Sequence, residues 1–282
     1  MLPKAAAADF SGRFREIIGD PLNLLIRRVP TAGHLLDGCV VLHNGHRVPV
    51  TGEAAYYGDF SQILILNRGV HEPLEEYAFQ QMLPHLPAAP RMLELGAYWG
   101  HYAMWCCQAR PAAQVVLVEP EAANLAAGQV SFRCNGHQGR FIRGFVDRGS
   151  FGVDAFLAET GWDRLEVLHS DVQGHEIAML EDAGQALAAG RVDYLFLSTH
   201  GQDLHARTRQ ILAGHGYRIE ADADFAAQTT SHDGFVLAVH PDRPAVLPGP
   251  AALMRAEIAQ AAPDSVLARL QAILAAAPAI TR

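Results

Sequence analysis

The sequence has little charge and few cysteines, and it lacks a long hydrophobic run. Only 18% of its 282 residues are charged, and 22 Lys and Arg against 30 Asp and Glu give a formal net charge of -8. A chain without excess positive charge is a poor partner for nucleic acid or an anionic membrane. No apolar run approaches the ~20 residues that cross a bilayer, and Asp9 interrupts the start before a signal segment forms. We therefore expect a cytoplasmic protein.

The four cysteines show no spacing typical of a metal site or of a disulfide framework. Cys106 and Cys107 are adjacent in the sequence, and neighbouring cysteines rarely bridge each other. We expect reduced thiols that serve as small buried side chains. Since 50% of the residues are hydrophobic, the chain can bury a core of one or two domains.

The pattern along the chain divides it into three parts. Residues 1–75 form an N-terminal cap, with helix-like spacing up to about residue 30 and a hairpin signal at Asn44-Gly45. Residues 76–241 form the main domain. Residues 242–282 form a C-terminal helical extension, rich in Ala and Leu from about residue 251. The two terminal helices either pack on the main domain or pair two copies of the chain as a homodimer.

The main domain alternates between strand and helix patterns. Its strand candidates are residues 91–94, 115–119, 140–142, 165–171 and 192–198. Nearly continuous apolar strands separated by helices are typical of a parallel sheet covered on both faces. Two further strands, 217–220 and 234–240, follow without a helix between them and predict an antiparallel hairpin at the sheet edge. The predicted fold is Rossmann-like α/β.

The first strand of this domain runs into a turn that contains two glycines, Gly96 and Gly100. Ligands of open α/β sheets lie outside the carboxyl ends of the strands, so this turn is the expected cofactor site. Glu94 either contacts the cofactor or ties down the turn through backbone N–H groups. The turn is not G-x-G-x-x-G, because Ala97-Tyr98-Trp99 fills the space between the glycines. That spacing disfavours a dinucleotide.

An acid, Glu119, ends the second strand about 20 residues after the glycine turn. A carboxylate at this place can accept hydrogen bonds from both hydroxyls of a ribose. Each charge-assisted bond contributes ~1.5–3 kcal/mol. We therefore expect a ligand that contains a nucleoside.

The segment Glu94 to Gly100, together with Glu119, resembles the S-adenosylmethionine site of class I methyltransferases. The later segments 169–176, His-Ser-Asp-Val-Gln-Gly-His-Glu, and 198–201, Ser-Thr-His-Gly, are similar to the FkbM family of methyltransferases. The resemblance covers about residues 54–240. It implies a seven-stranded sheet with an antiparallel last strand, S-adenosylmethionine as cofactor, and methyl transfer to a hydroxyl of a sugar, a polyketide or another small natural product.

Under this resemblance, the cofactor contacts are spread over the carboxyl ends of four strands. The expected cofactor-binding residues are Glu94, Gly96, Tyr98, Gly100, Glu119, Val146 and Asp171. Methyl transfer is an in-line displacement in which the cofactor supplies the electrophile and the protein must position the acceptor.

The acceptor end of the site is expected at Asp171, His200 and His232, which follow or precede late strands. A histidine with a carboxylate partner is a common general base at neutral pH. The same three residues could hold a divalent metal such as Mg, because Asp and His are ordinary ligands. The expected acceptor-pocket residues are His169, Tyr56 and Tyr57. Other histidines, such as His43, His46 and His137, fall in polar loops and indicate no second site.

Two other classes of function stay open at this point. A nicotinamide-dependent oxidoreductase uses the same turn and strand-end acid. A non-catalytic scaffold protein could keep the nucleoside-binding fold and assemble through its terminal helices. The acceptor molecule, and the choice between O- and N-methylation, are not encoded in these patterns.

Overall fold

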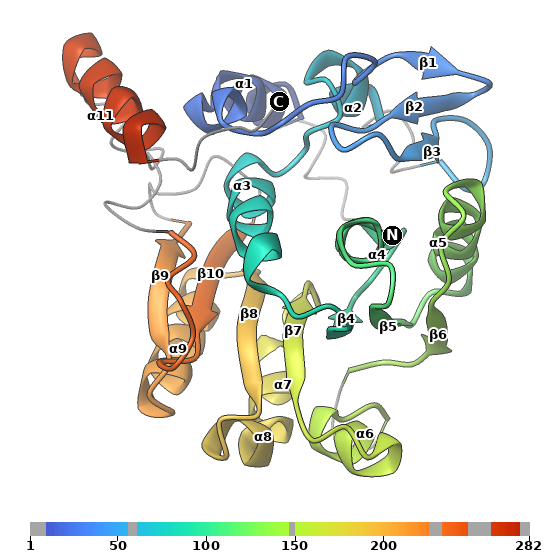
Figure 1. The fold of residues 1–282 in the computed structure, drawn as a ribbon, viewed down its shortest axis with the longest axis vertical. Coiled ribbons are helices and arrows are strands. Elements are labelled where there is room, and N and C mark those ends of the chain that lie inside the picture. The colour runs from blue at the N-terminus through green and yellow to red at the C-terminus, as the bar shows by residue number, and fades with distance from the viewer. Residues whose placement is uncertain (1–9, 56–60, 147–149, 226–232, 248–260, 277–282) are drawn as a thin grey trace.

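The computed structural model describes residues 10–55, 61–146, 150–225, 233–247 and 261–276. Within them, a seven-stranded sheet with helices around it forms the main body, and a small three-stranded sheet lies beside it near the N-terminal helix (Figure 1). The expected residues Tyr56, Tyr57 and His232 lie outside the described ranges. None of the helices in the described ranges has the length and apolar character that a membrane span requires.

The large sheet has the strand order β6-β5-β4-β7-β8-β10-β9. Its strands are β4 (Arg91–Leu95), β5 (Gln114–Glu119), β6 (Arg140–Arg143), β7 (Leu165–Ser170), β8 (Val192–Thr199), β9 (Arg218–Ala223) and β10 (Gly234–Val239). The pairs from β6 to β8 are all parallel, whereas β10 is antiparallel to both β8 and β9. This arrangement confirms the predicted Rossmann-like sheet and its late antiparallel hairpin.

Helices connect these strands and cover the sheet. They are α3 (Pro73–Met82), α4 (His101–Ala109), α5 (Ala122–Cys134), α6 (Val153–Thr160), α7 (Glu176–Asp182), α8 (Gly184–Ala188) and α9 (Gln202–Gly214). Pro73 stands at the first position of α3, where its fixed φ suits a helix start. Near the C-terminus, α11 (Pro263–Ala276) leaves Leu267 and Leu274 about half exposed.

The N-terminal region contains α1 (Phe10–Gly19), the 3-10 turn η2 (Pro21–Leu24), α2 (Gln62–Leu66) and the sheet β1 (Leu35–Leu36), β2 (Cys39–Val41) and β3 (Arg47–Pro49). The β2–β3 hairpin closes at Asn44-Gly45, where Gly45 has a φ of +96°. The edge strand β1 and the helix α2 were not predicted, because two-residue and five-residue elements carry too little periodicity. A further 3-10 turn, η4 (Leu83–His85), follows α3.

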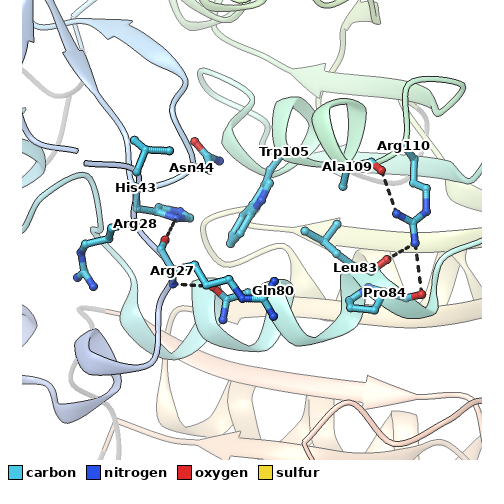
Figure 2. A pocket seen from close by; sticks show the side chains of 11 residues that line it. Arg27, Arg28, His43, Asn44, Gln80, Leu83, Pro84, Trp105, Ala109 and Arg110 are labelled. Atoms are coloured by element: carbon cyan, nitrogen blue, oxygen red, sulfur yellow. Dashed lines mark hydrogen bonds between the residues drawn. The ribbon is translucent and has the colours of Figure 1, made fainter. Parts of the chain in front are cut away.

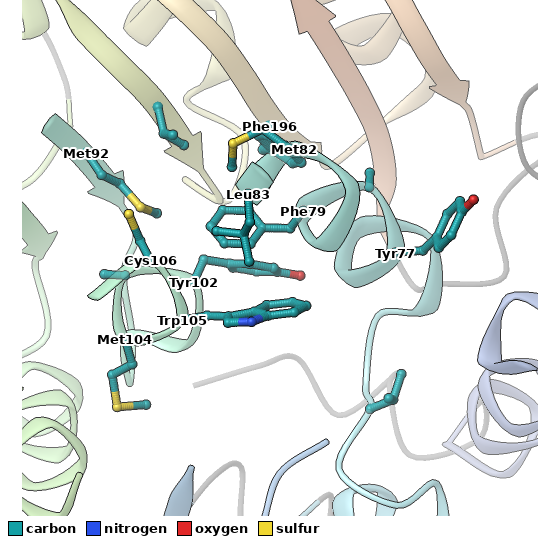
Figure 3. Packing of buried hydrophobic residues seen from close by; sticks show 14 of the residues in the cluster. Tyr77, Phe79, Met82, Leu83, Met92, Tyr102, Met104, Trp105, Cys106 and Phe196 are labelled. Atoms are coloured by element: carbon teal, nitrogen blue, oxygen red, sulfur yellow. The ribbon is translucent and has the colours of Figure 1, made fainter. Parts of the chain in front are cut away.

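Two apolar clusters lie on the two faces of the large sheet. On the face toward the N-terminal region, Phe79 packs against Tyr102, Trp105 and Phe196 with ring centroids 5.0–5.4 Å apart (Figure 3). The opposite cluster contains Leu168, Leu195 and Val236, all fully buried. Because both faces are covered, the central strands read as unbroken apolar runs.

The strand order reverses between β4 and β7, and the chain segments after these strands touch closely. Gly96 follows β4 with a φ of +67°, and a Cβ atom placed on it would lie 1.8 Å from the backbone oxygen of Asp171. The N–H of Asp171 in turn donates to the Leu95 oxygen at 2.9 Å. Only glycine fits this position.

We expect Gly96→Ala to lower the free energy of unfolding by about 2–5 kcal/mol. The left-handed backbone costs ~1–2 kcal/mol for a side-chain residue, and the collision with Asp171 adds ~1–3 kcal/mol. Gly136→Ala is the matched control, because Gly136 has a φ of +70° but nothing within 4 Å of its added Cβ. Urea unfolding measures both. Equal losses of unfolding free energy in the two variants would contradict a collision between a side chain at position 96 and the backbone oxygen of Asp171.

Candidate active site

The backbone of the glycine turn is bound to the neighbouring strand. The N–H groups of Gly96 and Ala97 both donate to the Val118 oxygen, at 2.9 and 3.1 Å. The Tyr98 N–H donates to Oε2 of Glu119 at 3.0 Å, and Tyr98 has a φ of +43°. These three N–H groups are therefore used within the protein.

Glu119 ends β5 beside the turn and is 4% exposed. Besides Tyr98 on Oε2, its Oε1 accepts from the Glu121 N–H at 3.0 Å and from Nδ2 of Asn124 at 3.2 Å. A carboxylate has about four acceptor positions, so these bonds leave about one for a ligand hydroxyl. Burial raises the pKa of Glu119, against the effect of the two backbone donors. The carboxylate therefore fixes the glycine turn against the start of α5.

Glu94 lies inside the fold, where it binds the start of α4. Its Oε2 accepts from the Ala103 N–H at 2.9 Å, and the residue is 2% exposed. Burial raises the pKa of Glu94 to about 7, although His169 and backbone donors oppose this shift. Of the two roles that the sequence left open, this contact matches a carboxylate that holds backbone N–H groups.

Two other expected cofactor contacts differ in their surroundings. Val146 is 6% exposed and packs in the cluster on the far face of the sheet, while its neighbour Phe145 is 42% exposed. The ring of Phe145 lies 4.6 Å from that of His175. The Tyr98 hydroxyl donates to the Ala55 oxygen at 3.5 Å and joins the turn to the N-terminal region. An adenine ring beside β6 would therefore meet Phe145 before Val146.

Asp171 and His200, which follow β7 and β8, meet at the carboxyl edge of the sheet. Nε2 of His200 lies 3.0 Å from Oδ1 of Asp171 and 3.5 Å from Oδ1 of Asp233, and Nδ1 lies 2.5 Å from Oε1 of Glu176. Nε2 of Gln173 donates to Oδ1 of Asp171 at 2.9 Å. One imidazole is thus surrounded by three carboxylates.

These carboxylates decide the charge of His200. Burial acts to lower the pKa of His200, but its hydrogen bonds to Asp171 and Glu176 and the nearby Asp233 outweigh burial and raise this pKa to about 10. Burial acts to raise the pKa of Asp171, yet His200 lowers it below its ordinary value. These shifts favour an imidazolium and a carboxylate at neutral pH. In that state Asp171, and not His200, is able to accept a proton.

His169 lies in the interior of the fold. It is 4% exposed, its Nε2 lies 2.7 Å from Oε1 of Glu75, and its ring is 4.3 Å from that of Tyr102. Burial raises the pKa of Glu75 to about 8 and lowers the pKa of His169. Both shifts favour the neutral forms of the carboxyl group and the imidazole.

Two buried acids of this region, Glu75 and Glu76, were not singled out by the sequence. Glu75 lies on α3, 94 positions from the histidine that it binds, and Glu72 accepts from the Tyr102 hydroxyl at 2.9 Å. Glu72, Glu75 and Glu76 recur at helical spacing, a signal usually produced by a solvated face, whereas Glu75 and Glu76 are 4% and 0% exposed. His43 and His46, expected in polar loops, are also buried.

Comparison with known proteins finds distant similarity in structure alone. No protein-family model matches the chain, and no curated protein matches it. A precorrin-6y C5,15-methyltransferase from Geobacter metallireducens is 13% identical with a TM-score of 0.42, over 58% of this chain and 86% of that one. A ribosomal protein L11 methylase from Lactobacillus delbrueckii subsp. bulgaricus is 13% identical with a TM-score of 0.42, over 63% and 82%. Fibrillarin from Aeropyrum pernix, solved with S-adenosyl-L-methionine, is 18% identical with a TM-score of 0.39, over 57% and 72%.

We expect the His200 ring to stay protonated well above pH 6.5. Its raised pKa stabilises the fold fully below the ordinary value of 6.5 and progressively less as pH rises toward about 10. The free-energy difference between the wild type and His200→Gln should therefore shrink over this window. NMR signals of the imidazole nitrogens, assigned by comparison with His200→Gln, show directly whether the His200 ring carries a proton on both nitrogens. Titration near pH 6.5 would contradict the imidazolium and make His200 the base of the cluster.

Proposed function

We propose that the protein is an S-adenosylmethionine-dependent methyltransferase. One observation carries the proposal: the strand order reverses between β4 and β7, and the glycine turn, Glu119 and the Asp171–His200 pair all stand at the carboxyl edge around that point. Ligands of open α/β sheets bind at such a reversal. The bulky residues 97–99 within the turn support a single nucleoside over a dinucleotide.

The residues present fit the nucleoside part of this cofactor. Glu119 keeps about one acceptor position for a ribose hydroxyl, and the exposed ring of Phe145 stands beside the next strand, where an adenine can stack. Carbonyl oxygens of the glycine turn suit the ammonium of the methionine part, because three of its N–H groups are already bonded. When bound, the cofactor supplies an electrophilic methyl group.

In this proposal Asp171 orients the acceptor. Among the described residues, the contacts of its carboxylate to His200 and Gln173 use Oδ1, and its side chain is 26% exposed. Oδ2 is thus left to accept a hydrogen bond from a hydroxyl. As the new C–O bond forms, that hydroxyl proton becomes strongly acidic, so even a carboxylate of lowered pKa accepts it. His200, held by Glu176, keeps Oδ1 in place.

The acceptor class in this proposal is a hydroxyl of a sugar, a polyketide or another small natural product, following the resemblance to the FkbM family. A carboxylate that accepts one proton late in the reaction supports the proposal of an alcohol as the methyl acceptor. A neutral amine acceptor would lose its proton without such a carboxylate. The exposed Leu267 and Leu274 on α11 support the further prediction that terminal helices pair two copies.

A divalent metal such as Mg is the second candidate for the acceptor end. Ligand atoms of Asp171, His200 and Asp233 lie within 4.8 Å of one another. Nε2 of Gln173 also lies 2.8 Å from Nε2 of His200. An ion would have to replace the proton on His200, and Mg²⁺ prefers oxygen ligands. Methyl transfer that survives exhaustive chelation would rule out the metal.

Calorimetric titration with S-adenosylhomocysteine tests the cofactor class. We expect the wild type to bind, and Glu119→Gln to bind more weakly by ~1.5–3 kcal/mol, because a charged acceptor is replaced by a neutral one. Glu121→Gln is the matched control: it removes the same charge two residues later, at an exposed side chain.

Absence of binding in the wild type would contradict the proposal. Equal weakening in both variants would show a general charge effect and remove the ribose role of Glu119. Circular dichroism spectra of the variants identify any loss caused by misfolding of the turn.

An activity assay tests the acceptor role of Asp171. We expect release of S-adenosylhomocysteine from S-adenosylmethionine in the presence of a productive alcohol, chosen from a panel of sugars and polyketides. Asp171→Asn should lower kcat ~10²–10⁴-fold, the range of lost general base catalysis, while S-adenosylhomocysteine still binds. Unchanged kcat in Asp171→Asn would contradict this role.

A further inference from the structure

A second group of potential metal ligands lies in the interior, apart from the Asp171–His200 pair. It consists of His43 after β2, Glu76 on α3 and His101 at the start of α4, with ligand atoms within 4.8 Å of one another. All three residues are at most 3% exposed. The group joins the N-terminal hairpin to the two helices that flank the glycine turn. We call it the buried His–Glu–His cluster.

Glu76 is held so that one oxygen points into this cluster. Its Oε1 accepts from the N–H groups of His71 and Glu72, at 2.8 and 3.1 Å, and lies 2.7 Å from Nδ1 of His71. Its Oε2 lies 3.0 Å from Nε2 of His43, and this ion-pair contact is the only one given for Oε2 among the described residues. A carboxylate fixed by one oxygen presents the other in a defined direction.

The two imidazoles are arranged in a matching way. Nδ1 of His43 pairs with the Arg27 oxygen at 3.4 Å, which leaves Nε2 to face Glu76 (Figure 2). His101 has both ring nitrogens buried, and neither has a hydrogen-bond partner within the described part of the chain. A buried polar group without a partner costs ~1–3 kcal/mol. The fold therefore leaves an unsatisfied imidazole against an aimed carboxylate.

We propose that His43, Glu76 and His101 bind one Zn²⁺ ion. Two imidazoles and one carboxylate are a donor set that zinc uses in proteins, with ligand distances of ~2.0–2.2 Å. The ion would give a partner to a nitrogen of His101 and would replace the direct contact between Oε2 of Glu76 and Nε2 of His43. Such an ion fastens the N-terminal hairpin to α3 and α4. The inference does not depend on the proposed methyl transfer.

Charge and access agree with an ion at this place. Zn²⁺ bound to the Glu76 carboxylate has a net charge of plus one. A further carboxylate is near, because Oε2 of Glu72 lies 3.4 Å from Nε2 of His71. His43 also lines a pocket of about 710 Å³ together with Arg28, Gln80 and Trp105 (Figure 2). Glu76 and His101 do not line this pocket, so it reaches the cluster only at His43.

The test is refolding of the untagged full chain. The protein is unfolded in guanidinium chloride with a chelator, then refolded with or without one equivalent of Zn²⁺. After dialysis we expect one zinc per chain by elemental analysis, and a higher Tm than that of the zinc-free sample. Co²⁺ in place of Zn²⁺ should give d–d absorption that reports nitrogen and oxygen ligands. Refolded wild type that retains no zinc and has the same Tm in both samples would overturn the proposal.

Two variants locate the ion. His101→Phe keeps a ring of similar size and removes both nitrogens, so zinc retention should fall at least ~10-fold. His200→Gln alters the other group of potential ligands and should retain one equivalent. The reverse result would assign the zinc to the Asp171–His200 pair and overturn the proposal. If His101→Phe does not fold, the wild-type refolding still decides whether the chain binds zinc, and His200→Gln still decides whether the Asp171–His200 pair holds it.

Discussion

The close approach of Gly96 to the backbone oxygen of Asp171 is the constraint on which the site depends. It places the segments after β4 and β7 in contact at the reversal of the strand order. The Asp171 N–H bonds to the Leu95 oxygen, and the N–H groups of Gly96 and Ala97 bond to Val118 on the other side. The position of the turn and the position of Asp171 are therefore fixed by the same few backbone atoms.

A second level of organisation comes from the acids of α3. Glu72, Glu75 and Glu76 turn inward and meet Tyr102, His169 and His43, which belong to three other parts of the chain. Burial of carboxylates is costly unless each finds hydrogen-bond partners. Because these partners come from the hairpin, α4 and β7, the helix connects the N-terminal region to the floor of the site.

The sequence predicted the large sheet well, because its central strands are nearly continuous apolar runs. Each of the seven strands was found within a few residues of its observed ends, and the late hairpin was recognised from the missing helix. The position of Glu119 beside the glycine turn was also predicted, from its distance along the sequence after Gly96. These features are local, and local patterns carry their information in adjacent residues.

The sequence could not predict partners that meet across long separations. Glu75 and His169 are 94 positions apart, and helical spacing alone does not tell a solvated acid from a buried one. His43 looked like a loop residue because its neighbours are polar, although the fold buries it against Trp105. The sequence also did not predict that the His169 side chain is buried. Alternation along β7 places a side chain on one face of the sheet, but it does not say what covers that face.

Hydrogen–deuterium exchange with and without saturating S-adenosylhomocysteine tests the central claim most directly. The account predicts slower exchange in three segments at the carboxyl edge: the glycine turn 95–101, the end of β5 with residues 119–124, and residues 171–175 after β7. Exchange elsewhere, including the hairpin 39–49, should be unchanged. Protection that is absent, or confined to segments away from this edge, would contradict a cofactor site at the strand reversal.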